Sequence, residues 1–495
     1  MKYRSVIILV CSASLMLAGM KSSPQIYLIG DSTMADKELI GNPERGWGQL
    51  FSVAFADPTV VQNHARNGRS TKSFIDEGRW QKVVQQLQQG DYVMIQFGHN
   101  DAKKEDLSRY AEARTDYRAN LIKFITDSRT KEAIPILITP VCRRRFDSKG
   151  RFYDIHGEYP AVVREIGKEF SVPVVDLHKR SHELFEQLGV EKTKSLFLLL
   201  DSGKYSAVPK GKEDNTHFSS IGAAEVARLV SEEIHRLGIP LGGMMRKDGP
   251  KELVGAGKLV MLDCFYNNEW KQDSKGRRYR YHYVWDDTAN SGFSMLGTII
   301  SQTGAVIDTL CQAPTQRTLQ RADIYIIVDP DTKQETEFPN FIDENAANAI
   351  TEWVKAGGVL VLLGNDKGKA EFEHFNRLAQ RFGIRFNEDS RNPATATEFA
   401  GATFNRFPDH PLFKDVRRVF IKEISTLNIQ EPARAIFTDN NDVIMAFAKV
   451  GKGAVFAVGD PWFYNEYMGT WRLPDGYDNP RAAENLFRWL LACAF

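Results

Sequence analysis

Short apolar segments that alternate with amphipathic helical segments constrain this chain more than any other feature. In the first half, five segments have the length of buried strands, and residues 110–127 repeat apolar side chains at the helical steps of three and four. This alternation predicts an α/β fold with a parallel sheet covered on both faces, whose sites form at the carboxyl ends of the strands. The predicted strands are Gln25–Ile29, Val60–Gln62, Tyr92–Phe97, Ile134–Ile138 and Val172–Val175.

A stretch rich in Gly and Pro separates this half from a second alternating region. At 495 residues the chain has room for two or three domains, because about 150 residues make an ordinary domain. We expect a first α/β domain over residues 24–238, a linker over 239–257 and a second α/β domain over 258–495. The second domain's predicted strands are Leu259–Cys264, Ile324–Val328, Val359–Leu363 and Ala454–Val458, and its predicted helices are Asn345–Lys355 and Pro480–Leu491.

The N-terminus has the order of features that is typical of a signal peptide. Lys2 and Arg4 precede an apolar run, residues 6–17, which is too short for a membrane span of about 20 residues. We expect residues 1–23 to be a signal peptide and the protein to be secreted or periplasmic; the alternative is a buried first helix. The formal net charge of +1 favours neither nucleic acid nor a membrane surface as a partner.

The four cysteines that follow the predicted signal peptide do not indicate a metal site. They are far apart, without a C-x-x-C pair, so we predict no bound metal. An oxidising compartment permits disulfides, but the sequence leaves their pairing open. Cys264 and Cys493 lie in apolar runs, and we expect them to be buried thiols rather than bridge partners; the other two are Cys142 and Cys311.

Three short polar motifs follow predicted strands of the first domain. In Ile-Gly-Asp-Ser-Thr, Ser32 lies on a strand-to-helix turn from which its hydroxyl can attack a carbonyl. In Asn-Gly-Arg-Ser-Thr, Gly68 lets its backbone N–H approach a ligand closely. In Phe-Gly-His-Asn-Asp, Asn100 offers an amide donor. Each motif taken alone is also an ordinary turn or helix cap.

The fourth motif, Asp-Asn-Thr-His-Phe, places Asp214 three residues before His217. This spacing lets the carboxylate bond the imidazole Nδ1–H; taken alone, the pair could equally be a capping Asp beside a surface His. Together the four motifs supply every role that serine acyl transfer needs: a nucleophile, a base, a group that orients the base, and donors for the oxyanion. The sequence therefore predicts one active site built from all four.

This set of motifs resembles the SGNH, or GDSL-type, hydrolase family, and in detail the rhamnogalacturonan acetylesterases of carbohydrate esterase family 12. The resemblance covers the predicted first domain and implies a three-layer α/β/α fold, a five-stranded parallel sheet, no cofactor, and deacetylation of an acidic pectic polysaccharide or oligosaccharide. It implies that Ser32 is the nucleophile, His217 the base and Asp214 its partner. The backbone N–H groups of Ser32 and Gly68 and the side chain of Asn100 then form the oxyanion hole.

The loop after the fourth predicted strand is rich in arginine and aromatic side chains. Guanidinium groups bind carboxylates bidentately and aromatic rings stack on sugars, so we expect Arg143, Arg144 and His99 to contact a uronate-containing substrate. The alternative is a solvated basic loop that pairs with Asp147 or Glu158. The family resemblance favours the pectic substrate.

The second half resembles the glutamine amidotransferase-like α/β fold that is attached to some bacterial carbohydrate-active enzymes. A working amidotransferase needs a Cys on a strand-to-helix elbow, whereas here strand 359–363 runs into Gly364-Asn365-Asp366, so we expect no amidotransfer. The aromatic segment Trp462–Tyr477 is either a sugar platform or packing, and packing is favoured because large aromatics are usually buried. The resemblance depends on Ala356–Leu360, His410–Phe413 and Gly451–Gly453.

Other functions remain open at this point. Within enzymes, the alternatives are an acetylesterase on xylan or another glycan and a lysophospholipase-like esterase; the arginine-rich loop disfavours a lipid substrate. A different class is a catalytically idle glycan-binding protein, which the presence of all four motifs disfavours. Neither the oligomeric state nor the acetyl position is indicated by the sequence.

Overall fold

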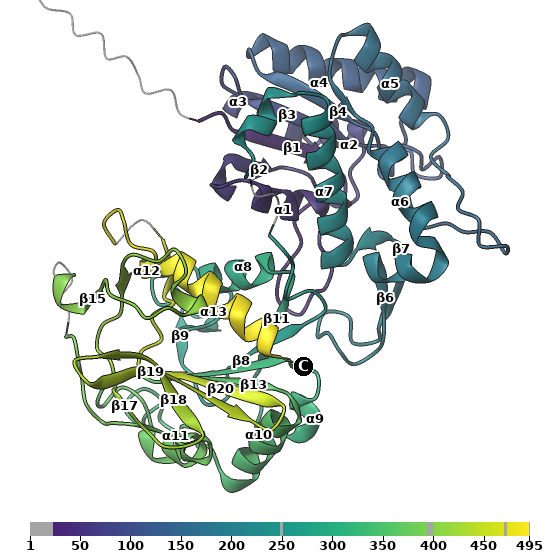
Figure 1. Ribbon diagram of the computed structural model, residues 1–495. Coiled ribbons are helices and arrows are strands. Elements are labelled where there is room, and N and C mark those ends of the chain that lie inside the picture. The colour runs from purple at the N-terminus through teal and green to yellow at the C-terminus, as the bar shows by residue number, and fades with distance from the viewer. Residues whose placement is uncertain (1–22, 248–250, 394–398, 470–472, 495) are drawn as a thin grey trace, which may run out of the picture.

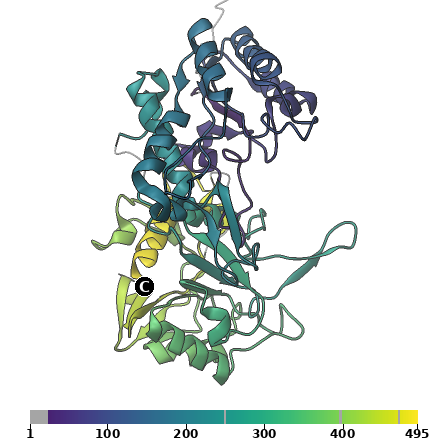
Figure 2. The same ribbon diagram turned by 90° about the vertical axis from the view of Figure 1, so that its right-hand side faces the viewer.

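The computed structural model describes residues 23–247, 251–393, 399–469 and 473–494. Two α/β regions are stacked one above the other (Figure 1, Figure 2). The predicted signal peptide lies outside the described residues except for its last position. No helix in the described part of the chain is long and apolar enough to cross a membrane.

The first region is built on a parallel sheet of five strands in the order β2-β1-β3-β4-β5, which confirms the predicted fold class (Figure 1). All five segments predicted as strands form strands, with ends shifted by at most two residues. Because the carboxyl ends of parallel strands share one edge, the segments that follow β1, β2 and β3 meet there. The strands are β1 (Ile26–Gly30), β2 (Val61–Asn63), β3 (Tyr92–Gln96), β4 (Ile134–Ile138) and β5 (Val174–Val175).

Apolar side chains on both faces of this sheet explain its three layers. Ile26 and Leu28 point into one core, and Tyr27 and Ile29 point into the other, because successive strand residues face opposite sides. Helices α1 (Trp47–Phe51), α6 (Leu177–Lys192) and α7 (Ser220–Arg236) cover the first face. Helices α2 (Thr71–Asp76), α3 (Arg79–Gln86), α4 (Arg118–Thr130) and α5 (Tyr159–Glu169) cover the second.

The helix predicted over residues 110–127 begins later than its apolar pattern indicated. A π-helical turn, Ala113–Tyr117, leads into α4. The Glu112 carboxylate accepts hydrogen bonds from the N–H groups of Arg114 and Thr115, so it caps the turn and ends the preceding loop.

The second region has a nine-stranded mixed sheet in the order β11-β8-β12-β13-β20-β19-β17-β14, with β18 paired to β19. Strands β11, β8, β12, β13 and β20 are parallel and the rest run antiparallel; the sequence predicted four of the parallel ones. The strands are β8 (Leu259–Asp263), β11 (Val306–Leu310), β12 (Ile324–Val328), β13 (Val359–Leu363), β14 (Ile384–Phe386), β17 (Leu427–Ile429), β18 (Ala433–Asp439), β19 (Asp442–Val450) and β20 (Gly453–Val458).

Helices cover both faces of this second sheet as well. Helices α8 (Ser294–Gln302) and α13 (Asn479–Cys493) pack on one face, while α9 (Gln316–Leu319), α10 (Glu344–Ala356) and α11 (Phe372–Ala379) pack on the other. The aromatic segment packs into the core of this region rather than forming a platform: its buried members are Trp462, Phe463, Tyr464 and Tyr467. Trp471 lies outside the described residues.

The expectation that Cys264 is a free thiol is wrong, because Cys264 and Cys311 form a disulfide. Each cysteine follows the end of a strand, and β8 and β11 are neighbours with Asp263 opposite Leu310. This register leaves the two Cα atoms 4.5 Å apart, within the range that a disulfide requires. Cys142 and Cys493 are free.

The two regions contact each other directly. Ile40 of the first region forms a parallel bridge with Ile307 of β11, and the N–H of Gly41 donates to the Ile307 carbonyl oxygen. The Ser206 hydroxyl donates to Asp308 Oδ1 at 2.9 Å. The predicted linker, 239–257, contains a short 3-10 helix, Pro240–Met244, and ends just before β8.

Candidate active site

A hydroxyl, an imidazole and a carboxylate form a continuous line at the carboxyl edge of the first sheet. His217 Nε2 lies 2.9 Å from Ser32 Oγ, and His217 Nδ1 lies 2.7 Å from Asp214 Oδ2. Ser32 comes directly after Asp31 on the turn that follows β1. These distances are within hydrogen-bond reach, so the imidazole can take a proton from the hydroxyl while the carboxylate holds its other nitrogen.

The imidazole and the carboxylate come from a hairpin outside the central sheet, not from the end of a sixth parallel strand. Strands β6 (Phe197–Leu200) and β7 (Lys212–Phe218) form this hairpin. Asp214 Oδ1 accepts hydrogen bonds from the N–H groups of Thr216 and His217, which bends β7 locally and turns the imidazole back to the carboxylate. Burial alone would raise the pKa of Asp214, but the hydrogen bond and charge of His217 outweigh it and lower that pKa.

Gly68 and Asn100 follow the two strands on either side of β1. Gly68 has a φ of +75°, a conformation that suits glycine. Among the described residues, no backbone carbonyl accepts a hydrogen bond from the N–H of Ser32 or of Gly68. Asn100 Nδ2 donates to the Arg69 carbonyl oxygen at 3.0 Å, which leaves its second N–H for another acceptor, and Arg109 Nη1 lies 3.5 Å from Asn100 Oδ1. This amide is therefore oriented from both ends.

Asp31 and His99 form a buried pair directly beneath the nucleophile. His99 Nδ1 lies 3.0 Å from Asp31 Oδ2, and the His99 side chain is 3% exposed. Burial would raise the pKa of Asp31, but His99, together with hydrogen bonds from Thr33, lowers it to about 2. The structure therefore places His99 inside the protein, away from the surface where a substrate contact was expected.

Arg143 and Arg144 hold the catalytic hairpin rather than extending into solvent. The Arg144 guanidinium donates to Thr193 Oγ1, Asn215 Oδ1 and the Val190 carbonyl oxygen at 2.7–3.0 Å. Arg143 donates to the His99 carbonyl oxygen and lies 3.4 Å from Thr216 Oγ1. Of the two acidic groups considered as partners of this loop, Asp147 pairs within it, with Arg151, whereas Glu158 pairs with Arg114 outside it.

A chain of ion pairs that the sequence interpretation missed reaches Asp214. Lys212 Nζ lies 3.2 Å from Asp214 Oδ2 and 3.1 Å from Glu44, and Lys37 lies 2.8 Å from Glu44. Lys212 is two residues before Asp214 on β7, so the strand period of two could have indicated that they share a face. The other two residues come from a loop far away in the sequence, and no local signal identifies them.

A hollow of about 560 Å³ adjoins Gly68 and is lined by three cationic side chains and three acidic ones, Asp76, Glu77 and Asp106. Arg69, Lys72 and Arg109 contribute positive charges to its lining, and Glu77 and Asp106 pair with two of them. Lys72 Nζ donates to the Leu107 carbonyl oxygen, and the Lys72 side chain is partly exposed. Lys72 has no carboxylate within ion-pair distance among the described residues, so it is the cation of this lining that can meet an anionic group.

Two groups of possible metal ligands lie within the part of the chain that the structure describes. They are Cys142, Asp154 and His178, and Glu371, Glu373 and His374. Neither group includes a member of the hydroxyl–imidazole–carboxylate line.

A parallel α/β sheet with this line at its carboxyl edge defines an ester hydrolase of the α/β class. Residues 28–223 match the GDSL-like lipase/acylhydrolase family, and residues 286–472 match a domain of unknown function, DUF4350. The rhamnogalacturonan acetylesterase RhgT of Bacillus subtilis (strain 168) is 44% identical over 222 residues, which are 45% of this chain and 94% of RhgT. The chain belongs to the GDSL-like lipase/acylhydrolase family, and it is a carboxylic ester hydrolase.

Two further comparisons concern the same half of the chain. The probable rhamnogalacturonan acetylesterase YesY of Bacillus subtilis (strain 168) is 36% identical over 216 residues, which are 44% of this chain and 94% of YesY. The crystal structure of protein YxiM from Bacillus subtilis has a TM-score of 0.38 at 26% identity and covers 44% of this chain and 58% of that chain.

Proposed function

We propose that the protein is a serine esterase that removes O-acetyl groups from rhamnogalacturonan, through an acetyl-serine intermediate. The observation that carries this proposal is the hydrogen-bonded line from Ser32 Oγ through His217 to Asp214. The activity of RhgT, which this chain matches over nearly the whole RhgT length, supports the choice of acetyl group and polysaccharide.

In the first half-reaction, His217 Nε2 takes the proton from Ser32 Oγ as the oxygen attacks the acetyl carbonyl. Asp214 accepts the Nδ1–H, keeps the imidazole in the required tautomer and stabilises its charged form. His217 then returns the proton to the sugar oxygen, which leaves as a hydroxyl. In the second half-reaction, water attacks the acetyl-serine with the same base and releases acetate, which restores Ser32.

The tetrahedral oxyanion receives three donors: the N–H groups of Ser32 and Gly68 and the free N–H of the Asn100 amide. The left-handed conformation of Gly68 and the fixed amide of Asn100 support this assignment, because donors that are oriented before the reaction need no reorganisation in the transition state. His217 and the backbone N–H groups of Thr216 and His217 keep Asp214 ionised, so that the carboxylate remains an acceptor for the imidazole, and Lys212 Nζ adds an ion pair at 3.2 Å.

The hollow beside Gly68 supports recognition of a uronate next to the acetylated sugar. Lys72 brings a cationic group without a carboxylate partner to its wall, whereas Arg69 and Arg109 pair with Glu77 and Asp106, and Arg143 and Arg144 bond the hairpin and its neighbours. We therefore assign the carboxylate contact to this hollow instead of the arginine-rich loop.

The proposal extends to the rest of the chain. We infer secretion or periplasmic location from the N-terminal signal peptide pattern, and a non-catalytic role for residues 258–495 as an amidotransferase-like fold. Support for the second inference comes from the five parallel strands and from Asn365, which stands where an amidotransferase would carry its Cys after β13.

The decisive experiment measures acetate release from acetylated rhamnogalacturonan and from acetylated xylan by the full chain and by Ser32→Ala. We expect faster release from rhamnogalacturonan, and a kcat lowered roughly 10⁴-fold or more in Ser32→Ala with an unchanged circular dichroism spectrum. Equal release from both polymers would remove the pectic assignment, and near-normal turnover by Ser32→Ala would remove the nucleophile.

The hollow is tested with Lys72→Ala and with Lys82→Ala as a matched control, since Lys82 is an exposed lysine on α3 outside the hollow. We expect Lys72→Ala to raise KM roughly 3–10-fold for the uronate polymer and to leave p-nitrophenyl acetate unaffected, because loss of one partly exposed charge contact costs about 1 kcal/mol. A change of the same size in Lys82→Ala would exclude a specific contact.

A further inference from the structure

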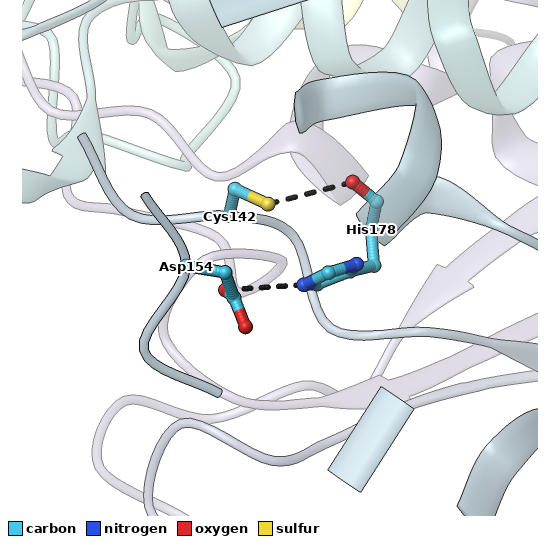
Figure 3. A group of neighbouring side chains, drawn as sticks. All are labelled: Cys142, Asp154 and His178. Atoms are coloured by element: carbon cyan, nitrogen blue, oxygen red, sulfur yellow. Dashed lines mark hydrogen bonds and ion pairs between the residues drawn. The ribbon is translucent and has the colours of Figure 1, made fainter. Parts of the chain in front are cut away.

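Three side chains with different donor atoms meet beyond His99 and His156, on the side of these two imidazoles that faces away from Ser32. Cys142 begins the loop that follows β4, Asp154 lies near the end of that loop, and His178 lies in the first turn of α6 (Figure 3). One ligand atom from each, the Cys142 sulfur, a carboxylate oxygen and an imidazole nitrogen, lies within 4.8 Å of the other two. Their sequence spacings of 12 and 24 residues match no short metal motif, so the sequence did not indicate them.

His178 and Asp154 are close enough to be two ligands of one ion, and the angles of their contact are poor for a hydrogen bond. His178 Nε2 lies 3.1 Å from Asp154 Oδ1, yet this buried nitrogen has no hydrogen-bond partner among the described residues. The carboxylate is therefore near the nitrogen but off the direction in which Nε2 donates or shares its lone pair. Two atoms that each bind zinc at about 2.0–2.2 Å come within about 3.0–3.5 Å of each other in this way.

We propose that Cys142, Asp154 and His178 form a zinc site with three protein ligands that ties both ends of the loop 139–158 to helix α6. A thiolate, an imidazole and a carboxylate are the donors that Zn²⁺ accepts in tetrahedral sites, whereas Ca²⁺ and Mg²⁺ require oxygen ligands. Water takes the fourth position. His156 Nδ1, 2.7 Å from Asp154 Oδ1, is the outer contact that orients the carboxylate.

The net charge of the ligands supports zinc binding in the protein interior. Cys142 is buried and its Sγ donates to the His178 carbonyl oxygen at 3.4 Å, so without a metal the sulfur is a thiol. Zinc binding exchanges that proton for the metal: the S–H bond breaks, the S–Zn bond forms and H⁺ leaves to solvent. The zinc ion with one thiolate and one carboxylate is neutral, and a neutral group costs less to bury than an isolated charge.

The zinc site would affect catalysis only by fixing the position of the loop that supports the hairpin. Arg143 follows Cys142 in the chain and donates to the His99 carbonyl oxygen beside the catalytic hairpin. The His156 ring packs edge-on against His99 at 4.9 Å, and His99 bonds Asp31. A zinc ion would therefore stiffen the loop that supports the hairpin without contacting substrate.

The first test uses the full chain, purified without chelator and then loaded with Co²⁺ as a spectroscopic probe. We expect about one metal ion per chain and a thiolate-to-cobalt charge-transfer band in the near ultraviolet. Cys142→Ser should lose this band, and Cys493→Ser, which removes the other free thiol, should keep it. Absence of the band in the full chain, or its loss only in Cys493→Ser, would overturn the proposal.

The second test changes no residue of the proposed site. Tm of the full chain should be higher with zinc than after treatment with a chelator, and the shift should persist in His374→Gln, which disrupts the other possible ligand group. A shift that disappears in His374→Gln would assign the metal to the second group and refute this site. The p-nitrophenyl esterase activity of the zinc-free protein separates this proposal from the proposed function, because acyl transfer from Ser32 needs no metal.

Discussion

The two regions share a parallel sheet with carboxylates at its carboxyl edge, but these carboxylates are in opposite electrostatic states. In the first region, histidine partners hold the pKa values of Asp31 and Asp214 below the ordinary carboxyl range, against the effect of burial. In the second, burial raises the pKa of Asp263 to about 6 and that of Asp460 well above its ordinary value, where Lys422 only partly offsets it. Asp31 and Asp214 are therefore charged, whereas Asp263 and Asp460 are prone to protonation, as is Asp101 at the first edge, whose pKa burial raises to about 7.

The difference lies in the partners that the loops supply. His99, His217 and Lys212 bring donors to the first edge. At the second edge the equivalent positions are closed by aromatic side chains such as Tyr283 and Trp462, both nearly fully buried. The first edge therefore combines ion-paired carboxylates with the hydroxyl–imidazole line, whereas large aromatic side chains pack against the second edge.

The sharpest test of this comparison replaces one asparagine in each region: Asn100, which follows β3, and Asn365, which follows β13. Asn100→Ala should lower kcat about 10²–10³-fold, the loss of one oxyanion donor. Asn365→Ala, which removes hydrogen bonds to Asp329 and Tyr283, should leave kcat unchanged. Steady-state kinetics on p-nitrophenyl acetate measures both, and a large loss of kcat in Asn365→Ala would give the second edge a part in the reaction.

Both cysteines of the disulfide lie in the second region, so opening it should destabilise that region and leave the first one stable. Cys311→Ser opens a cross-link across 47 residues of sequence and should reduce the free energy of unfolding of the second region by roughly 2–4 kcal/mol. The first region should keep its esterase activity at the same temperature. Urea unfolding followed by circular dichroism and by activity checks both, with Cys493→Ser as the unbridged control; parallel loss in both signals would mean that the regions unfold as one unit.

The smallest expected effect concerns pH: Asp214 and Asp460 should change the stability of the protein with pH in opposite directions. The lowered pKa of Asp214 makes its ionised form stabilising above the ordinary carboxyl pKa of about 4, and this contribution is lost as pH falls. The raised pKa of Asp460 makes its contribution fully present below about pH 4, and it is lost as pH rises through the raised value.

At about pH 8, Asp214→Asn should therefore lower Tm and Asp460→Asn should raise it, each by roughly 2–4 °C if the change is near 1 kcal/mol. The gain from Asp460→Asn should disappear near pH 4. Calorimetry at the two pH values measures these shifts, and two shifts of the same sign at pH 8 would contradict the contrast between the edges.

Local patterns predicted the parallel architecture and the identity of the line at the active site. Five strands of the first sheet follow from apolar runs, and the order of the motifs around Ser32, Gly68 and Asn100 follows from the topology of a parallel sheet. The disulfide was predicted wrongly, because the burial of Cys264 is visible in its apolar run whereas the register of β8 and β11 is not. The helical segment starts later than its apolar periodicity indicated, because the Glu112 side chain caps the π-helical turn that precedes α4.

What the sequence alone determined is therefore the fold class of both regions and the candidate residues for acyl transfer, because strand period, helix period and motif order are local properties of the chain. Only the tertiary structure decided which charges meet: Lys212 with Glu44, Arg144 with Asn215, and Cys142 with Asp154 and His178. Such contacts join segments that are distant in sequence, and their distances are set by the packing of whole layers, which no short stretch of sequence contains.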